Sequence, residues 1–153
     1  MAHYRPSILL DCDELASTMR KQDIQEIWHS HGMQPFEALV FSFQRAVEAN
    51  SIISDDGKVI GMFGVGEYAP NIGIPWLLGS DELPKIAKEF IPQSREWLDR
   101  VNQRYDLLFN FVYAKNTTSI RWLKWLGFSF IRQIDDFGVN PAPFIEFARH
   151  KGN

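Results

Sequence analysis

Residues 107–128 read LLFNFVYAKNTTSIRWLKWLGF, and this stretch decides the fold. Leu107–Tyr113 is almost continuously apolar, which is typical of a strand that is covered on both faces of a sheet. Asn116–Thr118 are residues that favour a helix N-terminus, and Gly127 stands where a left-handed helix cap is preferred. The stretch therefore predicts a buried strand, a tight connection and a short helix that ends at Leu126.

The residues before this stretch predict a hairpin. Ser51–Ser54 and Lys58–Gly66 flank Asp55–Gly57, and Asp-Gly supplies the positive φ that a tight turn requires. The second strand carries three glycines, which indicate a bulge, a close approach of another backbone or a ligand, or plain crowding by neighbouring side chains.

The remaining segments complete a mixed α/β pattern. We expect strands at Ser7–Leu10, Ile74–Leu78, Phe128–Ile134 and Phe144–Ala148, a broken helix over Glu14–His31 closed by Gly32, a helix from Pro35 to Val47, and a helix from Leu83 to Val101 that Pro92 kinks or divides. The fold class predicted is α/β (α+β): one domain over residues 1–153, with a mixed sheet of about six to seven strands and helices on both faces.

The composition excludes several classes of protein. There are 16 Lys and Arg against 19 Asp and Glu, a net charge of −3, so we expect no strongly basic nucleic-acid surface. No apolar run approaches the ~18 residues of a membrane span, and the N-terminus is too polar for a signal peptide, so we expect a cytoplasmic location. Cys12 is the single cysteine, the spacing of the four His does not suit zinc, and His29-x-His31 is the one pair worth testing. We therefore expect no metal.

Common catalytic motifs are absent from the sequence. It contains no Gly-x-Ser-x-Gly elbow and no phosphate loop that ends in Gly-Lys, which argues against hydrolases and nucleotide-hydrolysing enzymes. The strand that ends at Tyr113, the helix that Asn116 opens and Gly127 eleven positions later resemble the GNAT superfamily of acyl-CoA-dependent N-acyltransferases. The element order resembles the same superfamily over nearly the whole chain.

This resemblance implies acetyl-CoA as cofactor and an amine as substrate. It implies that the backbone of Phe111, Val112 and Tyr113 holds the pantetheine arm, that Asn116 positions it, and that Gly79 and Ser80 begin the loop for the coenzyme diphosphate.

Two features depart from the GNAT pattern. Asp81 and Glu82 place negative charge at the helix entrance where family members bind the diphosphate. Leu123 stands where many members carry a Tyr general acid, seven residues after the helix-opening Asn. The residues left for proton transfer are Tyr113 as acid and Glu67 as base, each weighed against an ordinary structural role.

A narrower resemblance accounts for these departures. Residues 76–81, 105–113 and 116–124 resemble the small internal virion or assembly proteins of short-tailed phages, which implies a role in virion morphogenesis and association with the virion. Trp122 and Trp125 share one helix face and serve either core packing or contact with a phage core protein. Two hypotheses remain: a phage- or prophage-encoded N-acetyltransferase, and a non-catalytic assembly protein with the same fold.

Overall fold

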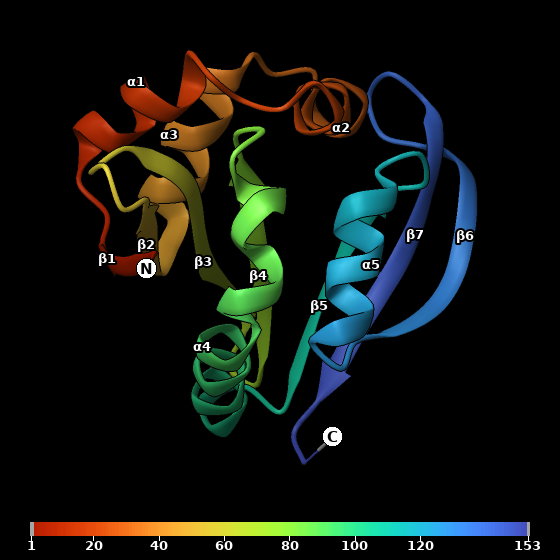
Figure 1. The fold of residues 1–153 in the computed structure, drawn as a ribbon. Coiled ribbons are helices and arrows are strands. Elements are labelled where there is room, and N and C mark those ends of the chain that lie inside the picture. Colours follow the sequence, from red (N-terminus) through yellow and green to blue (C-terminus); the bar gives the residue numbers. More distant parts are fainter. Residues whose placement is uncertain (1, 153) are drawn as a thin grey trace.

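A seven-stranded sheet organises the computed structural model, which describes residues 2–152 (Figure 1). The strand order is β1-β2-β3-β4-β5-β7-β6, so β7 lies inside the sheet between β5 and β6. Every neighbouring pair is antiparallel except β4 and β5, which are parallel. The elements are β1 (His3–Pro6), α1 (Leu9–Ala16), α2 (Lys21–His31), α3 (Pro35–Arg45), β2 (Ala46–Ile53), β3 (Val59–Ala69), β4 (Ile72–Gly79), α4 (Leu83–Arg104), β5 (Leu107–Tyr113), α5 (Thr117–Trp125), β6 (Ser129–Phe137) and β7 (Ala142–His150).

Helices cover both faces of this sheet, as predicted. One apolar cluster packs α4 and α5 against the sheet around Phe90, Leu98 and Trp122. A second cluster packs α1, α2 and α3 against the opposite face around Leu15 and Leu39. Side chains of β5 point to both faces, which explains why the sequence of this strand is continuously apolar.

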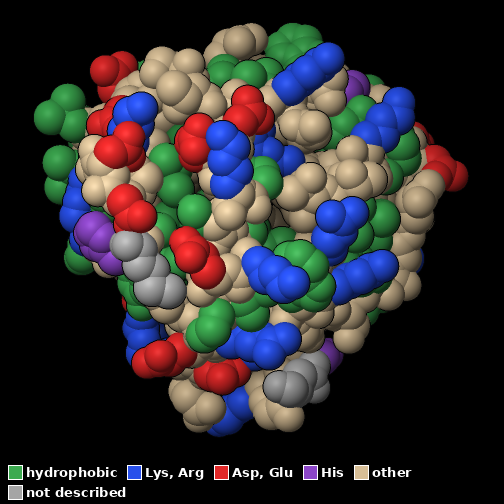
Figure 2. Space-filling model, in the orientation of Figure 1, with side chains coloured by type: hydrophobic (Ala, Val, Ile, Leu, Met, Phe, Trp, Pro, Cys, Tyr) green, Lys and Arg blue, Asp and Glu red, His purple; other side chains and the backbone are tan. Residues whose placement is uncertain are grey.

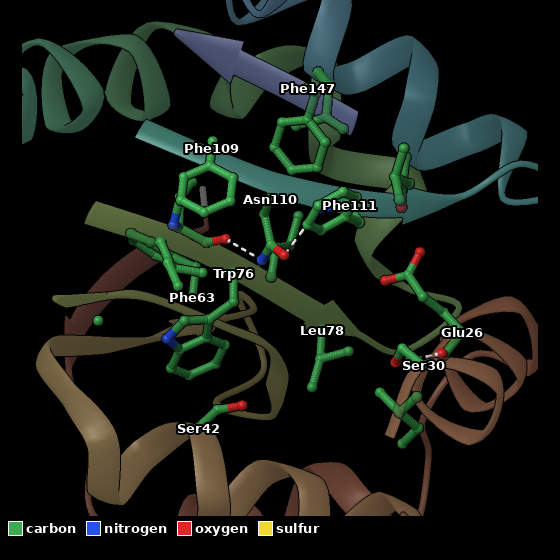
Figure 3. Close-up of a pocket in the computed structure, with 18 of the residues that line it drawn as sticks. Glu26, Ser30, Ser42, Phe63, Trp76, Leu78, Phe109, Asn110, Phe111 and Phe147 are labelled. Carbon is green, nitrogen blue, oxygen red and sulfur yellow. Dashed lines mark hydrogen bonds between the residues drawn. The ribbon is translucent and has the colours of Figure 1, made fainter. Parts of the chain in front are cut away.

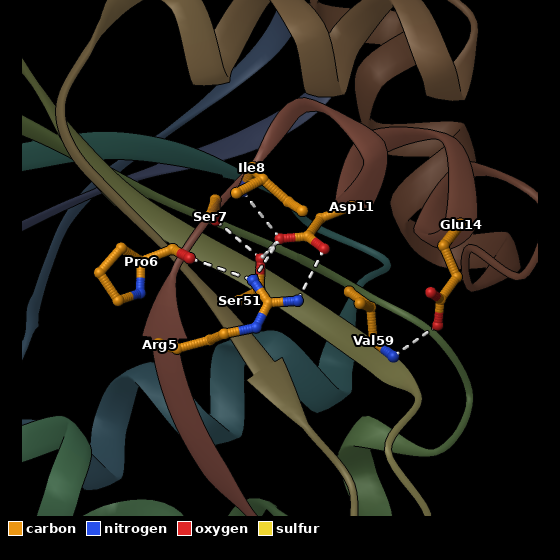
Figure 4. Close-up of polar contacts among 8 residues, drawn as sticks. All are labelled: Arg5, Pro6, Ser7, Ile8, Asp11, Glu14, Ser51 and Val59. Carbon is orange, nitrogen blue, oxygen red and sulfur yellow. Dashed lines mark hydrogen bonds and ion pairs between the residues drawn. The ribbon is translucent and has the colours of Figure 1, made fainter.

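The N-terminal segment differs from the prediction of a strand at Ser7–Leu10. The strand is His3–Pro6, which pairs with β2, and Leu9 begins α1. Asp11 is the cause: its carboxylate accepts the Ile8 N–H at 2.9 Å and the Ser51 hydroxyl at 2.7 Å, and it pairs with Arg5 at 2.8 Å (Figure 4). An acceptor for a free N–H in the first turn favours a helix start here.

The long helix α4 passes through Pro92 without dividing. It runs unbroken for 22 residues, and Ser94 donates its hydroxyl to the Phe90 carbonyl beside the proline. Within residues 2–152, none of the helices combines the length and the apolar character needed to cross a bilayer.

Crowding explains two of the three glycines in β3. A Cβ on Gly64 would lie 2.4 Å from the Glu48 carbonyl and 2.9 Å from the ring of Trp76, so this position must be glycine. A Cβ on Gly61 would lie 3.3 Å from Ile52, whereas one on Gly66 would meet only a carbonyl at 3.5 Å. Gly64 thus allows the Trp76 indole to lie directly against the strand.

Candidate functional site at the splayed strands

The two parallel strands separate after their first residues. β4 and β5 pair only at Ile72 with Leu107 and at Gly73 with Leu108. Beyond that point the edges of the two strands face each other across a gap, and a cavity of about 850 Å³ passes through it from one face of the sheet to the other. This is a volume suited to a small-molecule ligand.

Asn110 bridges the gap between the strands. Its Nδ2 donates to the Pro75 carbonyl of β4 at 2.8 Å, and its Oδ1 accepts the Phe111 N–H at 2.8 Å (Figure 3). The Phe111 N–H, which we expected to hold a pantetheine arm, is therefore bonded to the chain itself.

A buried polar cluster closes the wide end of the gap, where α2 lies across the ends of β4 and α5 (Figure 1). The guanidinium of Arg20 donates to Asp23 at 3.3 Å and to the side-chain Oδ1 of Asn116 at 3.1 Å. Asn116 Nδ2 donates to Asp23 at 3.0 Å and to Glu26 at 3.3 Å, and the Gly79 N–H donates to Asp23 at 2.9 Å. Arg20, Asp23 and Asn116 are each at most 4% exposed, whereas Glu26 is half-buried and lines the cavity.

Glu26 extends the cluster to β5. Its Oε1 accepts the Tyr113 N–H at 2.9 Å. Burial, followed by the nearby charge of Asp23, raises the pKa of Glu26 to about 8, although hydrogen bonds from Tyr113 and Asn116 oppose the shift. Burial also raises the pKa of Asp23, although the charge of Arg20 opposes the shift, so the two carboxyl groups share the single charge of Arg20.

The loop between β4 and α4 satisfies its own backbone donors. Besides the Gly79 bond to Asp23, the Ser80 N–H donates to the Ile60 carbonyl, the Glu82 N–H to the Ser80 hydroxyl, and the Leu83 N–H to the Ser80 carbonyl. A Cβ on Gly79 would lie 2.4 Å from Leu83, so packing against Leu83 accounts for this glycine.

A coenzyme diphosphate does not fit the loop as it stands. Four of its amides are already bonded, and Asp81 and Glu82 are exposed at the positive end of α4. In the space-filling view, Lys and Arg side chains gather over α5, whereas most Asp and Glu side chains in view lie to its left (Figure 2).

The two residues predicted for proton transfer are far apart. Glu67 lies where β4 and β5 still pair, and it accepts the Tyr105 hydroxyl at 2.8 Å. Tyr113 lies at the far end of β5, where its buried ring packs between His29 and Phe144. The strand rise of about 3.3 Å per residue puts roughly 16 Å between these ends. They are not brought together around one reacting atom.

The other predicted residues have largely structural surroundings. Val112 is buried against α4 and α5, and half-buried Leu123 packs on the same cluster. Trp122 is buried, whereas Trp125 is 37% exposed and available for contact with a partner. The rings of His29 and His31 bond to the Asn140 carbonyl and the Ser30 hydroxyl. Among residues 2–152, no group of three or more His, Cys, Asp or Glu is placed to hold a metal.

Sequence reasoning missed Asn110 and the acidic face of α2. Asp23 and Glu26 are three residues apart on a helix and therefore share a face, which is the one available signal. Nothing in the sequence indicates that this face meets Gly79 and Tyr113.

Comparison with known proteins gives one sequence family. The family described as "Bacteriophage T7, probable scaffold protein Gp13" matches residues 62–134, which include most of β3, all of β4, α4, β5 and α5, and the first part of β6. The probable scaffold protein gp13 of Escherichia phage T7 is 32% identical over 56 residues, which is 34% of this chain. The match spans 41% of the length of that relative.

Several solved structures similar to this chain are described as acetyltransferases. Ard1 from Thermoplasma volcanium superposes with a TM-score of 0.74 at 13% identity, covering 99% of each chain. A GNAT phosphinothricin acetyltransferase from Sinorhizobium meliloti, solved with acetyl-CoA, gives 0.70 at 16% identity, over 99% of this chain and 89% of its own. A GCN5-related N-acetyltransferase from Kribbella flavida gives 0.70 at 14% identity, over 97% of each chain. The chain therefore has the GNAT acetyltransferase fold, and its residues 62–134 resemble the family of the probable scaffold protein Gp13 of bacteriophage T7.

Proposed function

We propose that this protein is a phage- or prophage-encoded assembly protein that keeps the GNAT fold without acetyl transfer. The observation that carries the proposal is the internal bonding of the coenzyme-facing groups. Asp23 takes the Gly79 N–H, Glu26 takes the Tyr113 N–H and Asn110 takes the Phe111 N–H. A coenzyme would have to break these bonds and replace them one for one, which yields little net free energy.

Charge and side-chain chemistry support the same proposal. The acidic residues Asp81 and Glu82 oppose a diphosphate at the start of α4. Leu123 offers no proton to a leaving thiolate, and Glu67, on β3 near the start of β5, lies far from Tyr113 at the end of β5. The likeness of residues 62–134 to a probable scaffold protein supplies the assembly role, with host cytoplasm and virion as its locations and other virion proteins as its partners.

Calorimetric titration of the purified protein with acetyl-CoA and with CoA tests the loss of coenzyme binding. We expect no heat and no shift in melting temperature at millimolar coenzyme. A ligand at ~100 times its Kd adds about 2.7 kcal/mol, which for a chain of this size raises Tm by about 5–11 °C. A micromolar Kd with such a shift would overturn the proposal.

The assembly role has a separate test. Antibody detection in purified particles and in proheads of the phage that encodes the protein should find it in at least one of them. Its absence from both, together with intact particles after deletion of its reading frame, would contradict an assembly role whatever the calorimetry shows.

The retained cavity favours a second candidate, an acetyl-CoA-dependent N-acyltransferase. In that case Gly79 and Ser80, the backbone of Phe111–Tyr113 and Asn116 would hold the coenzyme after Glu26 and Asn110 turn away, and Glu67 or a water would take the amine proton. Asn116→Ala should then abolish acetyl transfer to an amine, and unchanged turnover would eliminate this candidate.

A further inference from the structure

Two buried hydrogen-bond donors in the cavity lack partners. Among the described residues, the indole Nε1 atoms of Trp76 and Trp122 are buried and bonded to no protein atom, and both residues line the cavity. A buried N–H without an acceptor costs about 1–3 kcal/mol. The two indoles lie on opposite faces of the sheet, since Trp76 packs with the α1–α3 cluster and Trp122 with the α4–α5 cluster.

The side of the cavity next to α3 is mainly apolar. Its walls include Phe109 and Phe111 from β5 and Trp76 and Leu78 from β4, and Ser42 of α3 lies across from Trp76 (Figure 3). Ring contacts hold the aromatic walls in place. Phe111 stacks on Phe137 with the ring centres 4.5 Å apart, and Phe109 lies edge-on to Phe111 with the ring centres 6.1 Å apart. Such walls favour an apolar ligand over a coenzyme diphosphate.

A cation lies at the rim of the same side. Arg45 is exposed and lines the cavity, and its guanidinium lies 4.2 Å from the centre of the Phe41 ring. Arg45 forms no ion pair with another residue of the described chain. Glu67 at this rim is already engaged by the Tyr105 hydroxyl at 2.8 Å and by Arg104 at 3.8 Å. Among the described residues, the Trp76 indole N–H lacks an acceptor and Arg45 lacks an ionic partner, so the ligand group that complements them is an acceptor, and beside Arg45 an anionic one.

We propose that the cavity binds a fatty acid. The carboxylate lies at the α3 side between Arg45 and the Trp76 indole N–H, and the alkyl chain runs past Phe109 and Phe111 into the gap between β4 and β5. The chain covers aromatic surface, and the carboxylate supplies the acceptor that Trp76 lacks. This proposal does not depend on the assembly role, because it uses neither the β4–α4 loop nor the exposed Trp125.

Calorimetry with dodecanoate tests the proposal, with 1-dodecanol as the probe that lacks the carboxylate, both below their aggregation concentrations. We expect dodecanoate to bind and dodecanol to bind roughly tenfold or more weakly. Failure of dodecanoate to bind, or equal affinity for the two probes, would overturn the proposal.

Three variants locate the ligand. Trp76→Phe keeps the aromatic wall but removes the indole N–H, and should weaken dodecanoate roughly tenfold. Arg45→Gln should weaken it about two- to fivefold, since the ion pair is exposed. Ser42→Phe should fill the chamber and abolish binding, with a thermal melt to show that it folds.

The matched control is Arg121→Gln, which removes an exposed cation from α5 and should leave binding unchanged. Wild-type affinity in both Trp76→Phe and Arg45→Gln, or an equal loss in Arg121→Gln, would show that the carboxylate lies elsewhere and refute the assignment.

Discussion

Replacing Arg20 by Met should destabilise the protein strongly. The side chains of Arg20 and Asp23 are 5% and 3% exposed, so water does little to screen the charge of Asp23 once its partner is removed. Breaking a buried ion pair by removing one member typically costs 3–5 kcal/mol, because it leaves an uncompensated buried charge. The variant also leaves the side-chain Oδ1 of Asn116 without the donor that lies 3.1 Å away in the wild type.

The expected loss can be measured by thermal and denaturant unfolding at pH 7. At about 2–4 °C per kcal/mol, the loss corresponds to a fall in Tm of about 6–20 °C. Arg121→Met is the matched control, because it removes an exposed arginine from α5 and should change stability by less than about 0.5 kcal/mol.

The double variant Arg20→Met with Asp23→Asn separates charge from packing. Asparagine keeps an acceptor for the Gly79 N–H but carries no charge, so the double variant should be more stable than Arg20→Met alone. If Arg20→Met loses no more stability than the control, or if the double variant recovers none of the loss, the buried Arg20–Asp23 ion pair does not stabilise this end of the gap and the reasoning is refuted.

Three further predictions concern pH and backbone geometry. Because the pKa of Glu26 is raised to about 8, its protonated form favours the folded state below about pH 4.5, and this contribution is lost as pH rises through 8. Between pH 5 and pH 9 the free energy of unfolding should thus fall less in Glu26→Gln than in the wild type. The control Glu89→Gln, at an exposed position, should show the same fall as the wild type. Burial raises the pKa of Glu48, but hydrogen bonds from Arg100, Trp97 and Asn50 outweigh burial and lower the pKa to about 2. The ionised carboxylate therefore stabilises the folded state above about pH 4.5, and this stabilisation is lost as pH falls toward 2. Glu48→Gln should therefore cost about 1–3 kcal/mol in denaturant unfolding at pH 7 and much less at pH 2; equal losses would contradict the assignment. Gly57 and Gly138 both have positive φ, but a Cβ on Gly138 would lie 2.2 Å from the His29 carbonyl, whereas a Cβ on Gly57 would meet nothing within 4 Å. The free energy of unfolding should therefore fall by ~1–2 kcal/mol in Gly57→Ala and by more in Gly138→Ala. Equal losses would refute the steric argument.

Local sequence signals predicted most of the fold because each depends on a few neighbouring residues. The apolar run at 107–113, Asp-Gly at 56–57 and Gly127 correspond to β5, the turn before β3 and the cap after α5, where Gly57 and Gly127 have φ of +82° and +85°. The start of α1 was predicted wrongly because the residues Ile8–Leu10 look like a strand, although they are exposed in the structure. Their conformation depends on Asp11, whose partner Ser51 is forty residues away.

The candidate site was less predictable, because its contacts join distant parts of the chain. Asn116 was identified from its spacing to Gly127, but its side chain serves Arg20 and Asp23 rather than a free groove. Asn110 looked like one polar residue in a buried strand, and only the separation of β4 from β5 gives it the Pro75 carbonyl as a partner. A sequence pattern can place residues on an element but does not show which distant groups that element will meet.

The position of β7 has a consequence for how the chain is made. This strand follows β5 and β6 in the chain, yet it lies between them in the sheet, so neither of those strands has its antiparallel partner until residues 142–150 have left the ribosome. The segment 62–134 contains β5 and the first part of β6 but not the strand that joins them. Both would present unpaired edges, which are open to pairing with other chains. Residues 142–150 therefore join β5 and β6 into one sheet and cover edges that would otherwise be open to other chains.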